Sequence, residues 1–211
     1  MKKLAKSVTL FMLLLVSLQV KSQSLDLRLL ESINGSVNPG PDRVWRSITN
    51  SAIPLSIVTP FALYAAGQLD HNQNLKEQSY VALVSLAGSA LLSTTLKAVT
   101  HRNRPFITYP GIIINKQSPT DYSFPSGHTT VAFSTATTLS LSFPKWYVIV
   151  PSFAYASAVG YSRVYLGVHY PSDVLGAALL GSGTAFLTYK ANQWLSKKYK
   201  KKLSDNYQST N

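Results

Sequence analysis

The sequence predicts an all-α protein: a membrane-embedded helical bundle with about five transmembrane helices after an N-terminal signal peptide. Three observations support this class, namely an apolar N-terminal run that follows lysines, five long stretches without a charged residue, and lysines gathered at the two chain ends. The 211 residues give room for one domain with a sizeable core. Cysteine is absent, which excludes disulfides, thiolate metal sites and cysteine nucleophiles.

The N-terminal segment, residues 1–22, has the pattern of a secretory signal peptide. Its lysines precede an apolar run from Val8 to Val20, which is short for a bilayer-spanning helix. Small side chains near Ser22 fit a cleavage site, so we expect the mature chain to begin at Gln23. An uncleaved membrane anchor is the alternative, because Lys21 is unusual so close to a cleavage site.

The next segment, residues 25–33, has leucines and an isoleucine at helical spacing, and the Asn34-Gly35 pair ends it. Such a helix either lies along the membrane surface or packs against the bundle. We assign residues 23–195 to the bundle and residues 196–211 to a basic cytoplasmic tail.

The five uncharged stretches are the candidate membrane crossings. They are residues 47–69, 78–96, 122–144, 146–162 and 174–189, with lengths of 23, 19, 23, 17 and 16 residues. A crossing needs roughly 17–25 residues. Their many Ser, Thr, Gly and Ala residues allow close helix packing in a membrane. The same composition, with a mean hydropathy of only +0.07, also fits a soluble bundle.

The net charge of +12 lies mostly at the chain ends, with +4 in residues 1–22 and +5 in residues 190–211. This distribution favours a role in membrane topology over nucleic-acid binding, so we expect no nucleic-acid partner. Five crossings from an outside start place Lys76, Lys145 and the C-terminal tail inside. They place the 97–125 loop and the 161–172 turn outside, which predicts a bacterial-type inner-membrane protein whose site faces the periplasm.

Three clusters in those outer segments carry the residue types of phosphate chemistry. Lys97 and Arg104 belong to the first, Pro125-Ser126-Gly127-His128 forms the second, and the third runs from Ser162-Arg163 to Asp173. Arginine grips two phosphate oxygens with a planar fork, and lysine adds a point charge. A helix start with Ser126 and Gly127 suits an anion, because backbone amides are free there and glycine allows close approach.

The two histidines of these clusters fit covalent and proton-transfer roles. His169 and Asp173 are four residues apart, with Pro171 placed to begin a helix. A carboxylate on one ring nitrogen fixes the tautomer and leaves the other nitrogen as a nucleophile. His128 follows the anion site directly, where it could protonate a departing oxygen.

These three patterns, K-x6-R-P, P-S-G-H and S-R-x5-H-x3-D, resemble the motif of the type 2 phosphatidic acid phosphatase family, which includes class A acid phosphatases and vanadium-dependent haloperoxidases. The resemblance covers residues 97–173. It implies that His169 forms a phosphohistidine, that Asp173 supports it and that His128 protonates the leaving group. It also implies a metal-independent reaction without a cofactor, and a set of residues that hold the phosphoryl oxygens: Lys97, Arg104, Ser126, Gly127 and Arg163.

We therefore expect a lipid phosphatase acting on lipid A, an isoprenyl diphosphate, or a phosphatidic acid or phosphatidylglycerophosphate. The lipid bilayer is its surroundings, and no obligatory protein partner is evident. The alternatives are a soluble periplasmic non-specific acid phosphatase, a vanadate-dependent peroxidase, and a phosphate-binding module or transporter. His101 and Arg102 lie outside the motif positions, and their place in the loop leaves contact with substrate as an alternative. Because it lies outside the motif, Arg102 serves as the control position for Arg104.

Overall fold

The computed structural model describes residues 25–35 and 37–209, with side chains described as far as residue 199. Its helices are residues 25–34, α2 (Pro39–Leu69), α3 (Gln73–Thr100), α4 (Pro105–Thr108), α5 (Gly127–Ser142), α6 (Trp146–Tyr165) and α7 (Pro171–Ser209). No strand occurs in the described part of the chain, which confirms the all-α prediction there. The predicted signal peptide, residues 1–22, lies outside the described residues.

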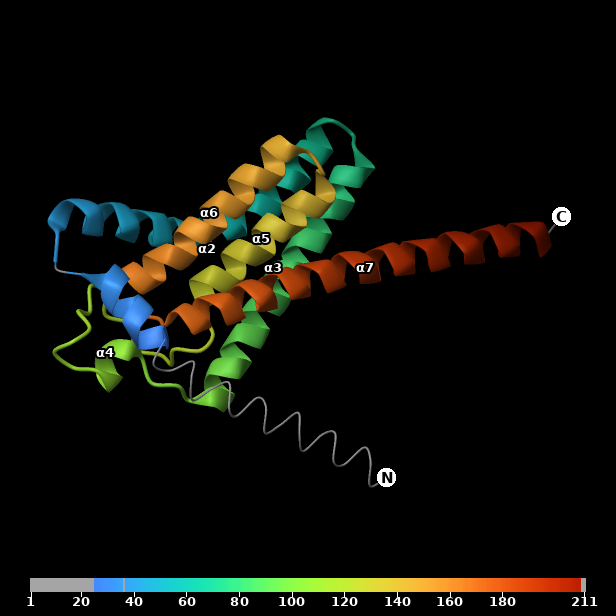
Figure 1. Ribbon diagram of the computed structural model, residues 1–211. Helices are drawn as coiled ribbons and strands as arrows, with labels where there is room; N and C mark the ends of the chain where they lie inside the picture. The colour runs from blue at the N-terminus through green and yellow to red at the C-terminus, as the bar shows by residue number, and fades with distance from the viewer. Residues whose placement is uncertain (1–24, 36, 210–211) are drawn as a thin grey trace, which may run out of the picture.

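Helix α5 forms the centre of the bundle and packs against α2, α3, α6 and α7 (Figure 1). The sequence predicts a crossing over residues 122–144, whereas the helix begins only at Gly127 and has 16 residues. The preceding residues belong to the loop that carries the Pro125-Ser126 step.

The helices bury small and polar side chains and expose large apolar ones. In α3, Ser85 and Ser89 are fully buried, whereas Leu91 is 69% exposed. In α7, Ala177 is fully buried and Leu179 is 77% exposed. A soluble bundle places its large apolar side chains inside. The opposite arrangement is typical of helices that pack through small residues and present apolar side chains to lipid.

Glycines bring the central helices into backbone contact. A Cβ on Gly181 of α7 would lie 2.2 Å from the carbonyl oxygen of Thr130 in α5. A Cβ on Gly160 of α6 would lie 2.8 Å from the side-chain atom Cγ1 of Val174 in α7, so there the close contact is between the α6 backbone and a side chain. These close approaches set the distance of α7 from its neighbours, and α7 carries Asp173 in its first turn.

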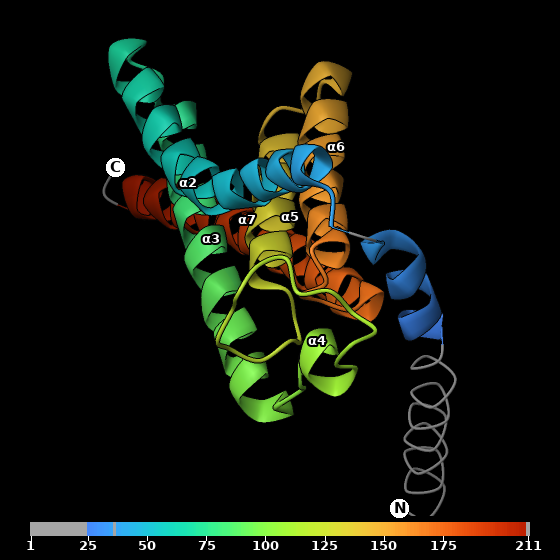
Figure 2. The same ribbon diagram turned by 90° about the vertical axis from the view of Figure 1, so that its left-hand side faces the viewer.

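Helix α2 changes direction along its length (Figure 2), and it contains Pro54 and Pro60. Proline removes a backbone donor and its ring displaces the preceding turn, so an interior proline bends a helix. The bend lets the first part of α2 cover the site end of the bundle, while the rest runs beside α3.

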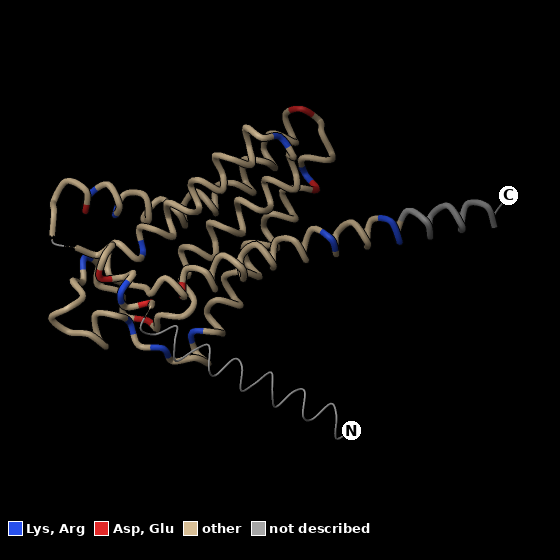
Figure 3. The backbone as a smooth tube through the Cα atoms, in the orientation of Figure 1, with Lys and Arg blue, Asp and Glu red and all other residues tan. Residues whose placement is uncertain are grey.

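The two ends of the bundle differ. The turn between α2 and α3 and the turn between α5 and α6 lie at one end, and the loop of residues 101–126 lies at the other, together with helix 25–34 and the α6–α7 turn (Figure 1). Charged residues gather at these ends and leave the middle of the bundle uncharged (Figure 3). In the described chain, Pro39–Leu69 and Gln73–Thr108 are long and apolar enough to cross a membrane by length and composition.

Candidate active site

Residues that are far apart in the sequence converge at the loop end of the bundle. Lys97 lies in the last turn of α3, Arg104 precedes α4, His128 lies in the first turn of α5, Arg163 lies in the last turn of α6, and His169 precedes α7, whose first turn holds Asp173. Helix ends supply these positions because the connecting loops lie on the same side of the bundle. The fold therefore brings the three motifs together at one end of the bundle.

Arg104 connects two of the three clusters. Its guanidinium is almost completely buried, and Nη1 donates a hydrogen bond of 2.6 Å to the carbonyl oxygen of Val168. The same nitrogen lies 3.2 Å from Nε2 of His169. Nε donates to the carbonyl oxygen of Asp121 at 2.7 Å. The planar fork is thereby fixed beside the His169 ring.

The His169 ring lies between a cation and a carboxylate. Its Nδ1 is 3.5 Å from Oδ2 of Asp173, and its Nε2 faces Arg104. Burial lowers the pKa of His169 well below its usual value; Asp173 opposes this effect, and the positive charges of Arg163 and Arg104 add to it. The Nδ1 contact is an ion-pair distance and not a hydrogen bond. A neutral ring with its proton directed at Asp173 turns its Nε2 lone pair towards the Arg104 guanidinium.

Asp173 is fully buried and fixed by several donors. Oδ2 accepts a hydrogen bond of 2.9 Å from the backbone N–H of Tyr170 and another from the Ser123 hydroxyl. Oδ1 accepts a hydrogen bond of 2.5 Å from Nη1 of Arg102. The carboxylate therefore has little freedom to rotate away from His169.

Asp121 fills the space between Lys97 and Arg104. Its Oδ2 lies 3.0 Å from Nζ of Lys97, and its Oδ1 accepts a hydrogen bond from Nη2 of Arg104. Burial alone would raise the pKa of Asp121, but the hydrogen bonds and charges of Lys97 and Arg104 lower it to about 2. A carboxylate thus occupies the position between the two cations that suits phosphate oxygens. Sequence reasoning missed Asp121, although it lies only four residues before Pro125.

Arg163 approaches the site from α6. Its Nη1 donates to Oγ1 of Thr49 at 2.9 Å and to Oε1 of Gln117 at 2.5 Å. Its Nε is buried without a hydrogen-bond partner in the described chain. Buried donors are usually paired, so an unpaired guanidinium nitrogen beside a phosphate site is a candidate ligand contact. Thr49 and Gln117 were also missed, because a lone Thr or Gln in a sequence carries no signal.

The second cluster contributes the start of α5. The Ser126 hydroxyl is buried and lies 2.9 Å from Oγ1 of Thr129, and the Ser126 N–H donates to the carbonyl oxygen of Asp173. Both predicted anion contacts of Ser126 are therefore engaged within the protein here. Gly127 begins the helix, so the amides of that turn have no acceptor within the helix.

A cavity of about 550 Å³ opens beside these residues, among α2, α3 and α5. Lys97, Asp121 and His128 line one part of it. Its other walls are mostly apolar and include Ile53, Ile57, Leu86, Ala90 and Val131. Ile53 and Ile57 are also partly exposed on the outside of the bundle, so the cavity reaches the surface that large apolar side chains cover.

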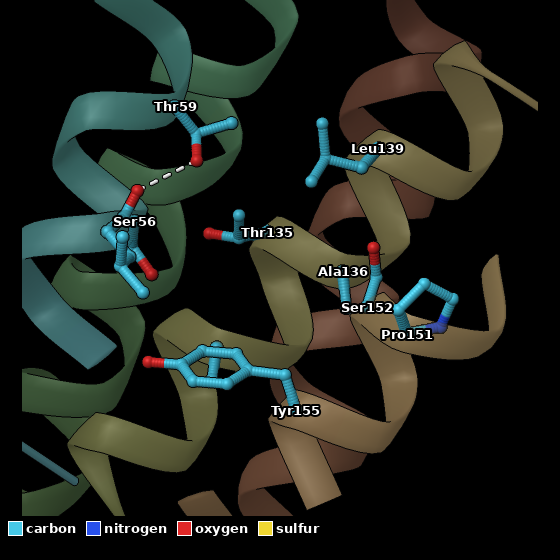
Figure 4. Close-up of a pocket in the computed structure, with 10 residues that line it drawn as sticks. Ser56, Thr59, Thr135, Ala136, Leu139, Pro151, Ser152 and Tyr155 are labelled. Atoms are coloured by element: carbon cyan, nitrogen blue, oxygen red, sulfur yellow. Dashed lines mark hydrogen bonds between the residues drawn. The ribbon is translucent and has the colours of Figure 1, made fainter. Parts of the chain in front are cut away.

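A second cavity, of about 320 Å³, lies among α2, α5 and α6 (Figure 4). It is lined by Ser56, Thr59, Thr135, Ser152 and Tyr155 together with apolar side chains. None of the ten residues that line it is a lysine, arginine, histidine or acid. It therefore lacks the charges that a phosphate would require.

One sequence-based interpretation is wrong. The sequence favours Arg102 as a control position for Arg104 because it lies outside the motif, but its guanidinium bonds Asp173 directly. The contact arises from tertiary packing, because the loop after α3 folds against the first turn of α7. The spacing of residues along the sequence does not reveal such a contact. His101 has a positive φ of 46° at the end of α3, and its ring packs against Tyr122.

Within the described residues, His, Asp and Glu do not gather into groups of three or more that could hold a metal ion. The expected independence from metals stays a prediction.

The comparisons with known proteins agree with this geometry. The family model of the PAP2 superfamily matches residues 79–197, which include every motif position described above. The chain belongs to the PAP2 superfamily. The predicted resemblance to type 2 phosphatidic acid phosphatases is confirmed.

Several PAP2 relatives are lipid phosphatases by name. An undecaprenyl-diphosphatase of Sulfolobus acidocaldarius is 41% identical over 106 residues, covering 50% of this chain and 51% of that protein. A lipid A 4'-phosphatase of Bacteroides thetaiotaomicron is 25% identical over 170 residues, covering 78% and 76%. The chain spans about half the length of the first of these relatives and of several others that it matches.

Two solved PAP2 structures share the fold. The transmembrane PAP2-type phosphatidylglycerolphosphate phosphatase of Bacillus subtilis has a TM-score of 0.69 and 25% identity, covering 88% of this chain and 95% of that one. LpxE of Aquifex aeolicus has a TM-score of 0.66 and 28% identity, covering 79% and 95%. Together with the two apolar helices, these neighbours identify an all-helical membrane protein.

Proposed function

We propose that the chain is a lipid phosphatase that hydrolyses a phosphomonoester or diphosphate of a membrane lipid through a phosphohistidine on His169. The observation that carries this proposal is the placement of the His169 ring. Its Nδ1 faces a buried carboxylate at 3.5 Å, and its Nε2 lies 3.2 Å from a guanidinium suited to phosphate. A neutral ring held in this way has the form of an activated nucleophile.

The reaction has two steps. Nε2 of His169 attacks phosphorus, the bond from phosphorus to the lipid oxygen breaks, and His128 protonates that oxygen. Water then attacks the phosphohistidine, gives a proton to His128, and releases inorganic phosphate and free His169. Lys97, Arg104 and Arg163 stabilise the charge that develops on the phosphoryl oxygens.

The apolar cavity beside Lys97 and His128 supports a lipid substrate. A phosphate between Lys97 and Arg104 leaves its organic group on the His128 side, where the cavity walls from α2 and α3 are apolar. An acyl or isoprenyl chain fits such walls, and Ile53 and Ile57 extend them to the exposed apolar surface. The named activities of the relatives place isoprenyl diphosphates, phosphatidylglycerophosphate and lipid A among the candidate substrates.

We also propose five membrane crossings, by α2, α3, α5, α6 and α7, with the site facing the periplasm across a bacterial-type inner membrane. Each predicted uncharged stretch overlaps one of these helices. Lys76 in the first turn of α3 and Lys145 just before α6 lie at the end of the bundle opposite the site, as an inner face requires. The outward apolar side chains favour this proposal over the soluble acid phosphatase.

A phosphate-release panel tests the function. Purified full-length protein is given undecaprenyl diphosphate, phosphatidic acid, phosphatidylglycerophosphate, lipid A and the soluble p-nitrophenyl phosphate, with and without excess EDTA. We expect faster release from at least one lipid than from the soluble ester, no loss with EDTA, and inhibition by vanadate. Preference for the soluble ester would support the acid phosphatase instead, and metal-restored activity would contradict the metal-independent mechanism.

The covalent step has its own test. Wild-type enzyme quenched during turnover of labelled substrate should carry an acid-labile phosphate, and His169→Ala should carry none and be inactive. Activity that survives in His169→Ala would overturn the phosphohistidine.

A further inference from the structure

The guanidinium of Arg102 joins two carboxylates from distant parts of the chain. Its Nη1 lies 2.5 Å from Oδ1 of Asp173, and its Nη2 lies 3.0 Å from Oδ2 of Asp26 in the helix of residues 25–34. Both carboxylates are almost completely buried, whereas the Arg102 side chain is about a quarter exposed. Neither Asp26 nor Arg102 has a role in the two chemical steps proposed above.

Asp26 is itself fixed to the first turn of α7. Its Oδ1 accepts a hydrogen bond of 2.9 Å from the backbone N–H of Ser172, and its Oδ2 accepts one from the Ser172 hydroxyl. That hydroxyl also accepts a hydrogen bond of 2.8 Å from Nη1 of Arg102. The guanidinium carbon lies 4.1 Å from the centre of the Tyr170 ring. Arg102 is therefore held by two carboxylates, a hydroxyl and an aromatic face at once.

Arg102 fixes one oxygen of the Asp173 carboxylate, and the Tyr170 N–H and the Ser123 hydroxyl fix the other. Oδ2 of Asp173 faces Nδ1 of His169, and Oδ1 on the opposite side receives Arg102. Without Arg102, Oδ1 would be a buried anionic oxygen that had lost its cation, which favours rotation of the carboxylate or uptake of a proton. Either change weakens the hold of Asp173 on the His169 ring.

We infer that Arg102 is a positioning residue for the nucleophile, and that Asp26 holds Arg102 in place. The helix of residues 25–34 thereby becomes part of the catalytic apparatus instead of a surface or packing element alone. Outer partners of this kind orient a reactive imidazole and tune its basicity. The inference rests on the proposed function, because it takes His169 as the nucleophile.

The test separates positioning from structural support. Kinetics are measured on full-length Arg102→Gln, Arg102→Lys and Asp26→Asn, with Arg28→Gln and Glu31→Gln as controls on exposed positions of the same N-terminal helix. We expect Arg102→Gln to lower kcat roughly 10- to 100-fold, the usual range for outer partners of a functional histidine. KM and vanadate inhibition should stay within about twofold, because Lys97, Arg104 and Arg163 are untouched.

Two conservative variants give a further test of the positioning role of Arg102. Arg102→Lys keeps a positive charge near Asp173 and should recover part of kcat, and Asp26→Asn should lower kcat less than Arg102→Gln does. Labelled phosphoenzyme should form more slowly in Arg102→Gln under single-turnover conditions. Thermal midpoints of the purified variants show whether the bundle itself is intact.

Two results would overturn the inference. One is wild-type kcat in a folded Arg102→Gln, and the other is a rise in KM without a change in kcat, which would make Arg102 a substrate contact. Failure of the proposed function looks different: wild-type protein would release no phosphate from any lipid, or His169→Ala would stay active.

Discussion

Nη1 of Arg104 lies 3.2 Å from Nε2 of His169 and donates to the carbonyl oxygen of Val168, the residue before that histidine. Arg104, the proposed phosphate-binding residue, is thus in direct contact with the proposed nucleophile and with the residue before it. A phosphoryl group that displaces the Asp121 carboxylate from Arg104 would therefore lie beside Nε2. This preorganisation is the property that a phosphoryl-transfer site requires.

Arg104→Lys should therefore lower kcat/KM by roughly 10- to 1000-fold, because a bidentate contact to developing charge is worth about 1.5–4 kcal/mol. Lysine keeps the charge but cannot contact Asp121, Val168 and a phosphoryl oxygen together. Arg43→Lys, at an exposed position of α2, is the matched control. Equal losses in the two variants would show that Arg104 contributes charge alone.

Asp121→Asn should tighten binding, because the Asp121 carboxylate competes with phosphate for Lys97 and Arg104. We expect KM and the vanadate inhibition constant to fall by roughly two- to fivefold, since exposed ion pairs are worth up to about 1 kcal/mol. Asp70→Asn, at the opposite end of the bundle, is the control. Weaker vanadate inhibition in Asp121→Asn would mean that Asp121 assists binding.

Gly181→Ala should destabilise the bundle by about 1–3 kcal/mol, the usual cost of overpacking. The new Cβ would lie 2.2 Å from the carbonyl oxygen of Thr130, a backbone atom, so α5 and α7 would have to separate. Gly183→Ala is the matched control, because nothing lies within 4 Å of a Cβ there. The thermal inactivation midpoint in detergent measures the difference, and equal midpoints would contradict the close packing.

Single cysteines test the topology, since the chain has no cysteine of its own. With five crossings, Ser118→Cys in the site loop should react with a membrane-impermeant maleimide on intact spheroplasts. Ser204→Cys in the C-terminal segment should react only after lysis. Labelling of both on intact spheroplasts would contradict five crossings, and recovery of the protein in the soluble periplasmic fraction would contradict membrane insertion.

The sequence predicted the motif residues well because their spacing follows from local structure. His169 and Asp173 are four apart around a helix start, and Pro171 marks that start. Lys97 lies in the last turn of α3, and Arg104 lies in the loop that follows it. These residues are close in the sequence, so a search for spacing patterns finds them.

The supporting residues could not be found in this way. Asp26 and Asp173 are 147 positions apart in the chain, and Arg102 bonds both carboxylates. Asp121 lies between Lys97 and Arg104 because a long loop folds back over α3. Contacts of this kind depend on how loops pack, and no local periodicity encodes them.

The sequence by itself determined the helical class, the uncharged stretches and the motif residues proposed to bind phosphate. These follow from hydropathy, charge and spacing, which are properties of the chain before it folds. Only the tertiary structure decided which faces of the Ser- and Thr-rich helices point inward. Ser85 and Ser89 are buried and Leu91 is exposed, and this arrangement separates a membrane bundle from a soluble one of the same composition. The physical reason is that composition describes all residues of a helix together. Whether the helix prefers water or lipid depends on the side chains of the face that its neighbours leave uncovered.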